Sequence, residues 1–498
     1  MTRITNRLVM LCGLLLAAAG GAASAAPADA AASSIQFHTC VIQGANGIRS
    51  EKARCATLSV PENRAAPDGR QIELAVAILP ALAARPAADP LFFIAGGPGQ
   101  SAVDGFFAEP GAFAAVRKHR DIVLVDQRGT GDSHSLDCPE QSEEAAALTE
   151  PTAAQRKALV AACLKHLSGD PRYYTTSVAI ADLDAVRQAL GAKQINLYGI
   201  SYGTRVALEY LRYYGEHVRS VVLDGVVPAD LALGPQVSLN AERALDAIFK
   251  RCEQAGPCAE RFPALAENFR QLNDRLREQP ARLTVPDPVT GESRQLTLTQ
   301  PVFANGVRLL TYSTETSSLL PLLIHKGATG YLGPLAALVS MINTDLAQSL
   351  SQGMYLSVLC TEDVPFYGPD AFKSDAARHT WAGTETLGAL HTACSVWPRG
   401  EIWPHFKEPV VSAKPVLLLS GSNDPITPPK NAAHAAKTLS NSLSIVVAGQ
   451  GHGNAYRGCL PRVMADFIQA ASVKNLDTAC VQRIRPAPFF LRFTGPAP

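Results

Sequence analysis

A Gly-x-Ser-x-Gly pattern, formed by Gly199, Ser201 and Gly203, stands where the strand-like run 194–198 gives way to a helical pattern. A serine hydroxyl is a weak nucleophile, and it reacts when it is held where a histidine can take its proton. A sharp strand-to-helix turn, the nucleophile elbow, exposes the hydroxyl in this way, and the two glycines leave room for neighbouring backbone. Ser201 is therefore the predicted nucleophile. An ordinary strand-to-helix turn is the alternative.

Two further residues could complete the chemistry, and each follows an apolar run. Asp424 comes after residues 415–419, and His452, flanked by two glycines, comes after residues 443–447. Loops that follow the carboxyl ends of parallel strands converge at one edge of the sheet. We expect Asp424 to orient His452 and to stabilise its imidazolium form. The chain order Ser, Asp, His is that of the α/β-hydrolase fold.

The developing negative charge on a substrate carbonyl needs two backbone donors, which together form an oxyanion hole. The N–H of Tyr202, directly after the nucleophile, is one candidate. Residues 91–94 form a continuous apolar run, typical of a buried strand, and a glycine-rich turn follows at 95–99. The N–H of Gly97 in that turn is the second candidate, and a plain loop is the alternative.

The remaining patterns predict the elements that position these residues. Residues 56–60 and 72–79 read as edge strands, and 121–125 and 218–225 read as buried ones. Strands that alternate with helical patterns favour a mostly parallel sheet. Residues 229–350 are helical in pattern apart from a hairpin between 283 and 298, as expected of an inserted cap. We expect the α/β-hydrolase core at 26–230 and 401–498, with the mainly helical cap and a return segment at 231–400.

The N-terminus has the pattern of an export signal. Arg3 and Arg7 precede the apolar run 8–19, and Ala23 and Ala25 mark a small-x-small cleavage site. The run is shorter than the roughly 20 residues that a bilayer requires, so we expect no integral membrane association. Residues 1–25 are the predicted signal peptide, and the mature chain is predicted to be periplasmic or extracellular.

Ten cysteines follow the predicted signal peptide, an even number in a chain expected to enter an oxidising compartment. Five disulfides are expected. The sequence does not decide the connectivity, but pairing of neighbours gives the shortest loops. Zinc is the competing explanation, but C-x-x-C pairs and histidine clusters are lacking, so we expect no metal and no cofactor. The neighbouring pairs are Cys40–Cys55, Cys138–Cys163, Cys252–Cys258, Cys360–Cys394 and Cys459–Cys480.

The overall composition argues against a nucleic-acid partner. The 498 residues carry a formal net charge of +1, 18% of them are charged, and no long acidic or basic run occurs. The expected partner is a peptide or a small ester substrate. The oligomeric state is left open.

Taken together, these motifs resemble the secreted α/β-hydrolases of the prolyl aminopeptidase and tripeptidyl aminopeptidase family of serine peptidases. The resemblance rests on the Gly-Gly-Pro-Gly turn 96–99, the runs 126–131 and 199–204, Ser133, Cys138, and the segments around Asp424 and His452. Prolyl aminopeptidases usually have histidine before this turn, whereas this chain has Ala95, so the resemblance favours the tripeptidyl branch.

The resemblance implies removal of N-terminal residues or short peptides at a site that the cap roofs. Ester hydrolysis is the main alternative, because the same triad serves both acyl groups. A binding protein without catalysis is a third reading, which the presence of all three triad residues disfavours.

An aminopeptidase must also recognise a free ammonium group, for which a carboxylate is the natural partner. Glu362 and Asp363 follow an apolar run and stand close to Cys360, so their backbone is expected to be rigid. They are the candidates for amine binding. A structural ion pair or a solvated acidic turn is the alternative.

Overall fold

The described residues form a central sheet of nine strands in the order β1-β2-β3-β5-β4-β6-β7-β10-β11. Strands β1 to β3 are antiparallel to their neighbours, and the six strands from β5 to β11 are parallel, as the sequence patterns predicted. The strands are β1 (His38–Gln43), β2 (Ser50–Pro61), β3 (Gln71–Leu79), β4 (Leu91–Ile94), β5 (Ile122–Val125), β6 (Ile195–Ile200), β7 (Val218–Asp224), β10 (Val416–Gly421) and β11 (Ser442–Val447).

The computed structural model describes residues 35–45, 47–109, 111–138, 151–286, 291–368, 371 and 374–495. The predicted signal peptide, residues 1–25, lies outside the described residues. Strand β1 was not expected from the sequence. Its side chains are mostly exposed, so it lacks the apolar run that marks the buried strands.

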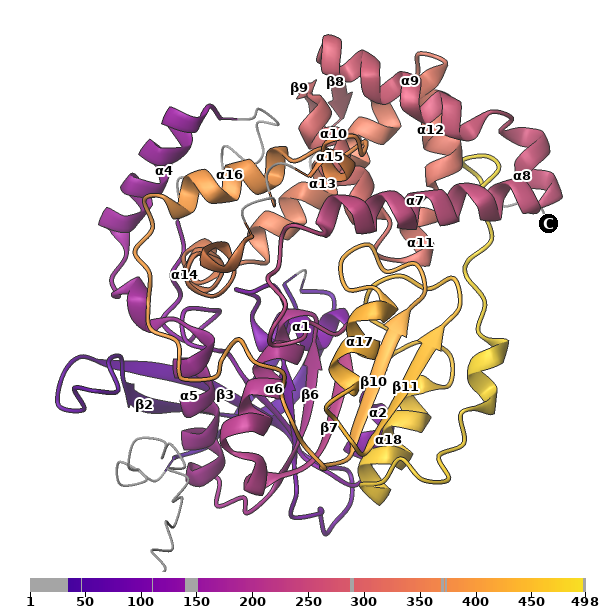
Figure 1. Ribbon diagram of the computed structural model, residues 1–498. Coiled ribbons are helices and arrows are strands. Elements are labelled where there is room, and N and C mark those ends of the chain that lie inside the picture. The colour runs from indigo at the N-terminus through magenta and orange to yellow at the C-terminus, as the bar shows by residue number, and fades with distance from the viewer. Residues whose placement is uncertain are drawn as a thin grey trace, which may run out of the picture. The chain divides into compact units, whose positions relative to one another are not determined.

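Helices cover both faces of the sheet (Figure 1). One face packs on α5 (Thr176–Ala189), α6 (Tyr202–Tyr213) and α17 (Pro429–Ala436), and the other on α1 (Ala102–Ala108), α2 (Ala114–Arg117) and α18 (Leu460–Ala470). Neighbouring strand residues enter opposite cores, as Phe92 and Phe93 do. Burying each such side chain contributes roughly 1.5–3 kcal/mol, which is why the central strands are apolar throughout.

The segment between β7 and β10 forms the cap, which lies over the end of the sheet in Figure 1. It has its own hydrophobic core, in which the rings of Phe249, Phe269 and Phe303 pack at 5.7 Å. Strands β8 (Ala281–Pro286) and β9 (Ser293–Leu298) form an antiparallel hairpin, where one was expected. The helices are α7 (Val237–Gln254), α8 (Gly256–Arg261), α9 (Leu265–Glu278), α10 (Gln300–Leu310), α11 (Thr314–Ser317), α12 (Leu320–Ala328), α13 (Gly333–Gln348), α14 (Gln352–Glu362), α15 (Asp375–Arg378) and α16 (Glu385–Cys394).

Five disulfides join the ten cysteines, and each links neighbours in the chain, the pairing that short loops favoured. Cys138–Cys163 and Cys360–Cys394 share one small apolar cluster, where α4 (Ala153–His166) packs on α16. These two disulfides therefore join segments of the cap side of the molecule, and all four of their cysteines pack in the same small hydrophobic cluster.

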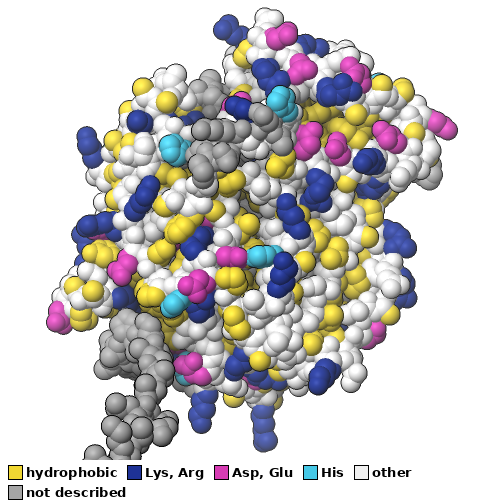
Figure 2. Space-filling model, viewed as in Figure 1, with side chains coloured by type: hydrophobic (Ala, Val, Ile, Leu, Met, Phe, Trp, Pro, Cys, Tyr) yellow, Lys and Arg dark blue, Asp and Glu magenta, His cyan; other side chains and the backbone are white. Residues whose placement is uncertain are grey.

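Acidic and basic side chains are interspersed over the face seen in Figure 2, in keeping with the near-zero net charge. In the part of the chain that the structure describes, no helix is long and apolar enough to cross a membrane.

We expect the mature protein, purified under non-reducing conditions, to gain the mass of ten hydrogen atoms on reduction, because five disulfides are present. Intact-mass spectrometry measures this gain. Ten free thiols before reduction would contradict the pairing.

The loops that the bridges close also differ in length. Cys360–Cys394 spans 34 residues and Cys252–Cys258 spans 6, so replacing the first pair by alanine should cost about 1.5 kcal/mol more unfolding free energy. Urea denaturation of the two double variants compares them.

Candidate active site

Ser201 lies in the turn between β6 and α6, and its backbone adopts φ 55° and ψ −125°. Such angles are strained for any residue other than glycine, and surrounding contacts must hold them in place. The Ser201 N–H donates to the carbonyl of Asp224 at 2.8 Å. Its own carbonyl accepts the N–H and the hydroxyl of Thr204, at 2.9 and 2.6 Å. The side chain is half-buried, so the elbow presents its hydroxyl at an accessible position.

The two flanking glycines are required by close backbone packing. A Cβ on Gly199 would collide with the backbone of Gly203, and a Cβ on Gly203 would collide with the carbonyl of Ile94. Helix α6 therefore begins in direct contact with the end of strand β4. This is the close approach that the Gly-x-Ser-x-Gly pattern predicted.

Asp424 and His452 form a hydrogen bond of 2.8 Å between Oδ2 and Nδ1. The Asp424 side chain is fully buried, and its Oδ1 accepts the N–H groups of Ile426 and Thr427 at 2.9 and 2.8 Å. The Thr427 hydroxyl donates to Oδ2 at 2.7 Å. Burial would raise the pKa of Asp424, but His452 and these hydrogen bonds hold it below its usual value. The carboxylate is thus kept ionised beside the imidazole.

The imidazole of His452 has a pKa above its usual value. Burial lowers this pKa, and the Asp424 carboxylate more than offsets the effect of burial. A neutral imidazole held by a carboxylate at Nδ1 is ready to accept a proton at Nε2.

The histidine loop packs against the elbow. A Cβ on Gly225, the residue after Asp224, would lie 2.8 Å from Cε1 of His452, and one on Gly453 would lie 3.2 Å from Cδ1 of Ile200. Asp224 also binds the N–H of Ser201. The loop that carries His452 therefore adjoins the elbow that carries Ser201, at the carboxyl ends of the parallel strands.

The glycine-rich turn after β4 passes beside the nucleophile. A Cβ on Gly96 would lie 3.1 Å from Cβ of Ser201. Gly97 has φ 103°, which glycine adopts without strain. Tyr202 is the first residue of α6, where the N–H groups lack intrahelical partners and the helix dipole favours negative charge. Both predicted oxyanion donors thus belong to segments that adjoin Ser201.

Glu362 and Asp363 are placed differently from the sequence-based expectation. Neither side chain has any exposed surface. Asp363 binds both terminal nitrogens of Arg205, at 3.0 and 2.9 Å, and accepts the N–H of Leu233. Glu362 accepts the N–H and the hydroxyl of Thr176 at 2.7 and 2.8 Å. The expectation that they bind a substrate amine is corrected: they form the buried ion-pair network that was the alternative.

This network supports the oxyanion side of the site. The Thr176 hydroxyl that bonds Glu362 also lies 2.6 Å from the hydroxyl of Tyr202. Burial raises the pKa of Glu362 to about 7, against the opposing effect of Arg205. The acids therefore lie behind Tyr202 and help to fix the start of α6.

Sequence reasoning missed the part played by Asp224, which it read only as a strand residue. Its Oδ2 accepts the N–H groups of Asn454 and Ala455, both at 2.7 Å, and the hydroxyl of Tyr198 at 3.2 Å. One residue thus holds the elbow through its carbonyl and the histidine loop through its side chain. The sequence did offer a signal for this role, because Asp224 is an acidic residue at the carboxyl end of β7, the strand next to β6 and the elbow.

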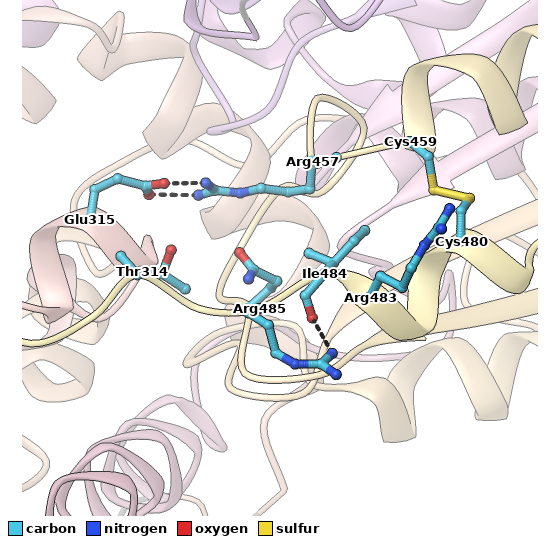
Figure 3. Close-up of a pocket in the computed structure, with 11 residues that line it drawn as sticks. Thr314, Glu315, Arg457, Cys459, Cys480, Arg483, Ile484 and Arg485 are labelled. Atoms are coloured by element: carbon cyan, nitrogen blue, oxygen red, sulfur yellow. Dashed lines mark hydrogen bonds and ion pairs between the residues drawn. A yellow bond between two sulfur atoms is a disulfide. The ribbon is translucent and has the colours of Figure 1, made fainter. Parts of the chain in front are cut away.

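A cavity of about 480 Å³ lies behind the histidine loop and is lined by Gln450 but not by Ser201 or His452. Figure 3 shows two of its lining residues, Glu315 of the cap and Arg457 of the core, pointing toward each other as an ion pair. The Arg457 side chain holds the pKa of Glu315 at about 2. This ion pair is one of the links between cap and core.

Among the residues that the structure describes, no group of three or more His, Cys, Asp and Glu side chains is arranged to hold a metal ion.

Comparison with known proteins identifies the family to which this chain belongs. The family profile described as alpha/beta hydrolase fold matches residues 89–250, and the one described as TAP-like protein matches residues 380–480. Carboxylesterase B of Mycobacterium tuberculosis is 30% identical over 471 residues, covering 86% of each chain. Tripeptidyl aminopeptidase of Streptomyces lividans is 25% identical, covering 93% of this chain and 89% of that one.

Two more relatives extend the comparison. Serine protease Hip1 of M. tuberculosis is 25% identical, covering 86% of this chain and 87% of that one. Proline iminopeptidase of Mycobacterium smegmatis, a solved structure, is 16% identical with a TM-score of 0.39, covering 83% of this chain and 98% of that one. The chain is a serine hydrolase, and it belongs to the α/β-hydrolase family that includes the tripeptidyl aminopeptidases and carries a TAP-like C-terminal region.

Proposed function

We propose that the protein is an exported aminopeptidase that releases short N-terminal peptides through an acyl-enzyme on Ser201. The observation that carries this proposal is the 2.8 Å hydrogen bond from His452 to the buried Asp424, on a loop packed against the strained elbow of Ser201. A serine, a histidine and a carboxylate in this relation perform acyl transfer on several unrelated folds.

The mechanism follows from the positions of these groups. Nε2 of His452 takes the Ser201 proton as Oγ attacks the scissile carbonyl, while Asp424 holds Nδ1–H and stabilises the imidazolium. The N–H groups of Gly97 and Tyr202 receive the oxyanion, and each such donor stabilises the transition state by about 3 kcal/mol. The imidazolium then protonates the leaving amine, and a water molecule hydrolyses the acyl-enzyme by the reverse sequence.

The buried carboxylates favour release of a short peptide rather than a single residue. Glu362 and Asp363 are sealed behind Tyr202, so they do not offer an ammonium partner next to the scissile bond. The ammonium group of an extended tripeptide lies roughly 10 Å from that bond, and it would be bound elsewhere under the cap. The relative named tripeptidyl aminopeptidase supports this choice.

Export is supported by the N-terminal signal pattern, residues 1–25, and by the five disulfides. Disulfides of this number persist in oxidising compartments such as the periplasm or the extracellular medium.

A carboxylesterase is the second candidate. The observation in its favour is the 30% identity to carboxylesterase B, together with the absence of Glu362 and Asp363 from the accessible surface. An ester substrate requires no ammonium partner, and the same triad and oxyanion donors would serve it.

Replacing Ser201 by alanine should lower kcat by about five to six orders of magnitude, because the triad residues act as a unit. Ser444→Ala, at an exposed position of β11, is the matched control and should keep full activity. Steady-state kinetics with thermal melting of both variants tests this expectation. Near-normal turnover by a folded Ser201→Ala protein would exclude the assignment.

The rate should fall on the acid side as His452 becomes protonated, since only the neutral imidazole can accept the serine proton. The pKa of His452 is raised above 6.5, so the acid limb of kcat/KM is expected above pH 6.5. Asp424→Asn removes the carboxylate that raises this pKa, so the residual activity should show its acid limb at lower pH. A limb below pH 6 in the wild-type enzyme would disagree with this account.

The aminopeptidase should cleave a tripeptide anilide with a free N-terminus at least tenfold faster, in kcat/KM, than its N-acetylated counterpart, because the ammonium contributes binding free energy of about 1.4 kcal/mol or more. A simple aryl ester serves as the control for the acyl-transfer machinery. Equal rates for the free and blocked peptides, or hydrolysis of the ester alone, would favour the carboxylesterase.

A further inference from the structure

Arg308 of helix α10 is a half-buried cation that reaches the catalytic histidine through one intervening residue. Its Nη1 donates to the hydroxyl of Tyr312 at 2.8 Å, and its guanidinium carbon lies 5.5 Å from the centre of that ring. The Tyr312 ring meets the His452 ring edge to face at 5.1 Å, and its carbonyl accepts the N–H of His452 at 2.7 Å. The three side chains therefore form a contiguous row that runs from the cap to His452.

The guanidinium is held in one orientation. Its Nη2 donates to Oδ1 of Asn305 at 2.7 Å. Nδ2 of Asn305 in turn donates to Asn343, whose own amide nitrogen bonds the carbonyl of Val339 at 2.8 Å. The bonds to Tyr312 and Asn305 use two of the five N–H groups of a guanidinium. An arginine fixed in advance loses little further conformational freedom when it binds an anion.

The charge of Arg308 has no carboxylate partner among the ion pairs of the described residues. Arg205 and Arg457 do have one, since Arg205 pairs with Asp363 and Arg457 pairs with Glu315, whereas Arg251 of α7 is half-buried and likewise has no ion pair among the described residues. A carboxylate brought by a ligand would give this guanidinium charge-assisted hydrogen bonds, which are stronger than its present bonds to neutral groups.

The charge of Arg308 is close enough to two residues near the site to influence their pKa values. Burial lowers the pKa of His452, Asp424 raises it more strongly, and Arg308 acts against Asp424. Burial raises the pKa of Tyr355, and Arg308 opposes that shift as well. The backbone nitrogen of Tyr355 lies 3.5 Å from a Cβ built on Gly99, within the glycine-rich turn. Arg308 thus acts on groups at both sides of the catalytic centre.

We propose that Arg308 binds a carboxylate of the substrate next to the scissile bond, and so makes the enzyme selective for acidic substrates. The inference rests on the proposed acyl-transfer function and specifies its substrate class. The carboxylate can come from an acidic side chain of the acyl part or from the free C-terminus of a short leaving peptide. Both present the planar pair of oxygens that a guanidinium binds with strong hydrogen bonds.

Two matched substrate pairs distinguish the sources. Ala-Ala-Glu and Ala-Ala-Gln p-nitroanilides differ only in the acyl side chain, and tetra-alanine and its C-terminal amide differ only in the leaving part. We expect the wild-type enzyme to prefer the carboxylate member of one pair by about tenfold or more in kcat/KM. Arg308→Gln should abolish the preference, and Arg308→Lys should retain part of it. Arg282→Gln, at an exposed position of the cap hairpin, is the control and should leave the preference unchanged.

The pH profile gives a readout that a purely structural role for Arg308 would not move. Removing the cation should raise the pKa of His452, so the acid limb of kcat/KM should shift to higher pH in Arg308→Gln and stay in place in Arg308→Lys. Thermal melting checks that each variant is folded.

Calorimetric binding of both substrate pairs to Ser201→Ala, with and without Arg308→Gln, provides a measurement that does not depend on turnover. Tighter binding of a carboxylate member that disappears with Arg308→Gln supports the inference even if the peptides are not cleaved. The inference would be overturned if the wild-type enzyme bound and cleaved the carboxylate and neutral members of each pair equally well. It would also be overturned if a preference for the carboxylate member survived Arg308→Gln. Failure to cleave any peptide or ester would instead count against the proposed function.

Discussion

The strained backbone of Ser201 is the constraint on which the rest of the site depends. A non-glycine residue at φ 55° costs roughly 1–3 kcal/mol, and the structure keeps it there with bonds from both sides. The carbonyl of Asp224 holds the N–H of Ser201, and Thr204 holds its carbonyl twice. The strained turn positions the Ser201 hydroxyl for reaction, because a side chain on such a turn projects away from both the strand and the helix.

The cap forms hydrogen bonds with three of the segments proposed to carry the chemistry, which are the loops of His452 and Asp424 and the oxyanion turn. The carbonyl of Tyr312 holds the N–H of His452, and the N–H of Ser351 bonds Gly99 in the oxyanion turn at 2.9 Å. Arg243 of α7 donates to the carbonyl of Asp424 at 2.7 Å. These bonds tie the positions of the base, the acid and the oxyanion turn to the position of the cap.

The sequence predicted the features that depend on local pattern. Buried parallel strands are apolar throughout, and Ser201, Asp424 and His452 stand in short motifs at strand ends, so they could be proposed as a triad without a structure. Features that depend on distant segments could not be found in this way. Glu362 and Asp363 looked accessible in the sequence because Arg205, which neutralises them, is 158 residues away from Asp363. Arg308 and Tyr312 stand in an ordinary helical sequence pattern, which does not reveal that Tyr312 contacts His452 in the folded chain.

Ser201 is proposed as the serine that is activated for nucleophilic attack, and covalent labelling tests this role most directly. A fluorophosphonate that mimics the tetrahedral intermediate should modify the mature protein once per chain, and peptide mapping by mass spectrometry should place the label on Ser201. His452→Ala should greatly slow this reaction, because the hydroxyl then lacks its base. A label on another residue, or no label on folded protein, would contradict the account.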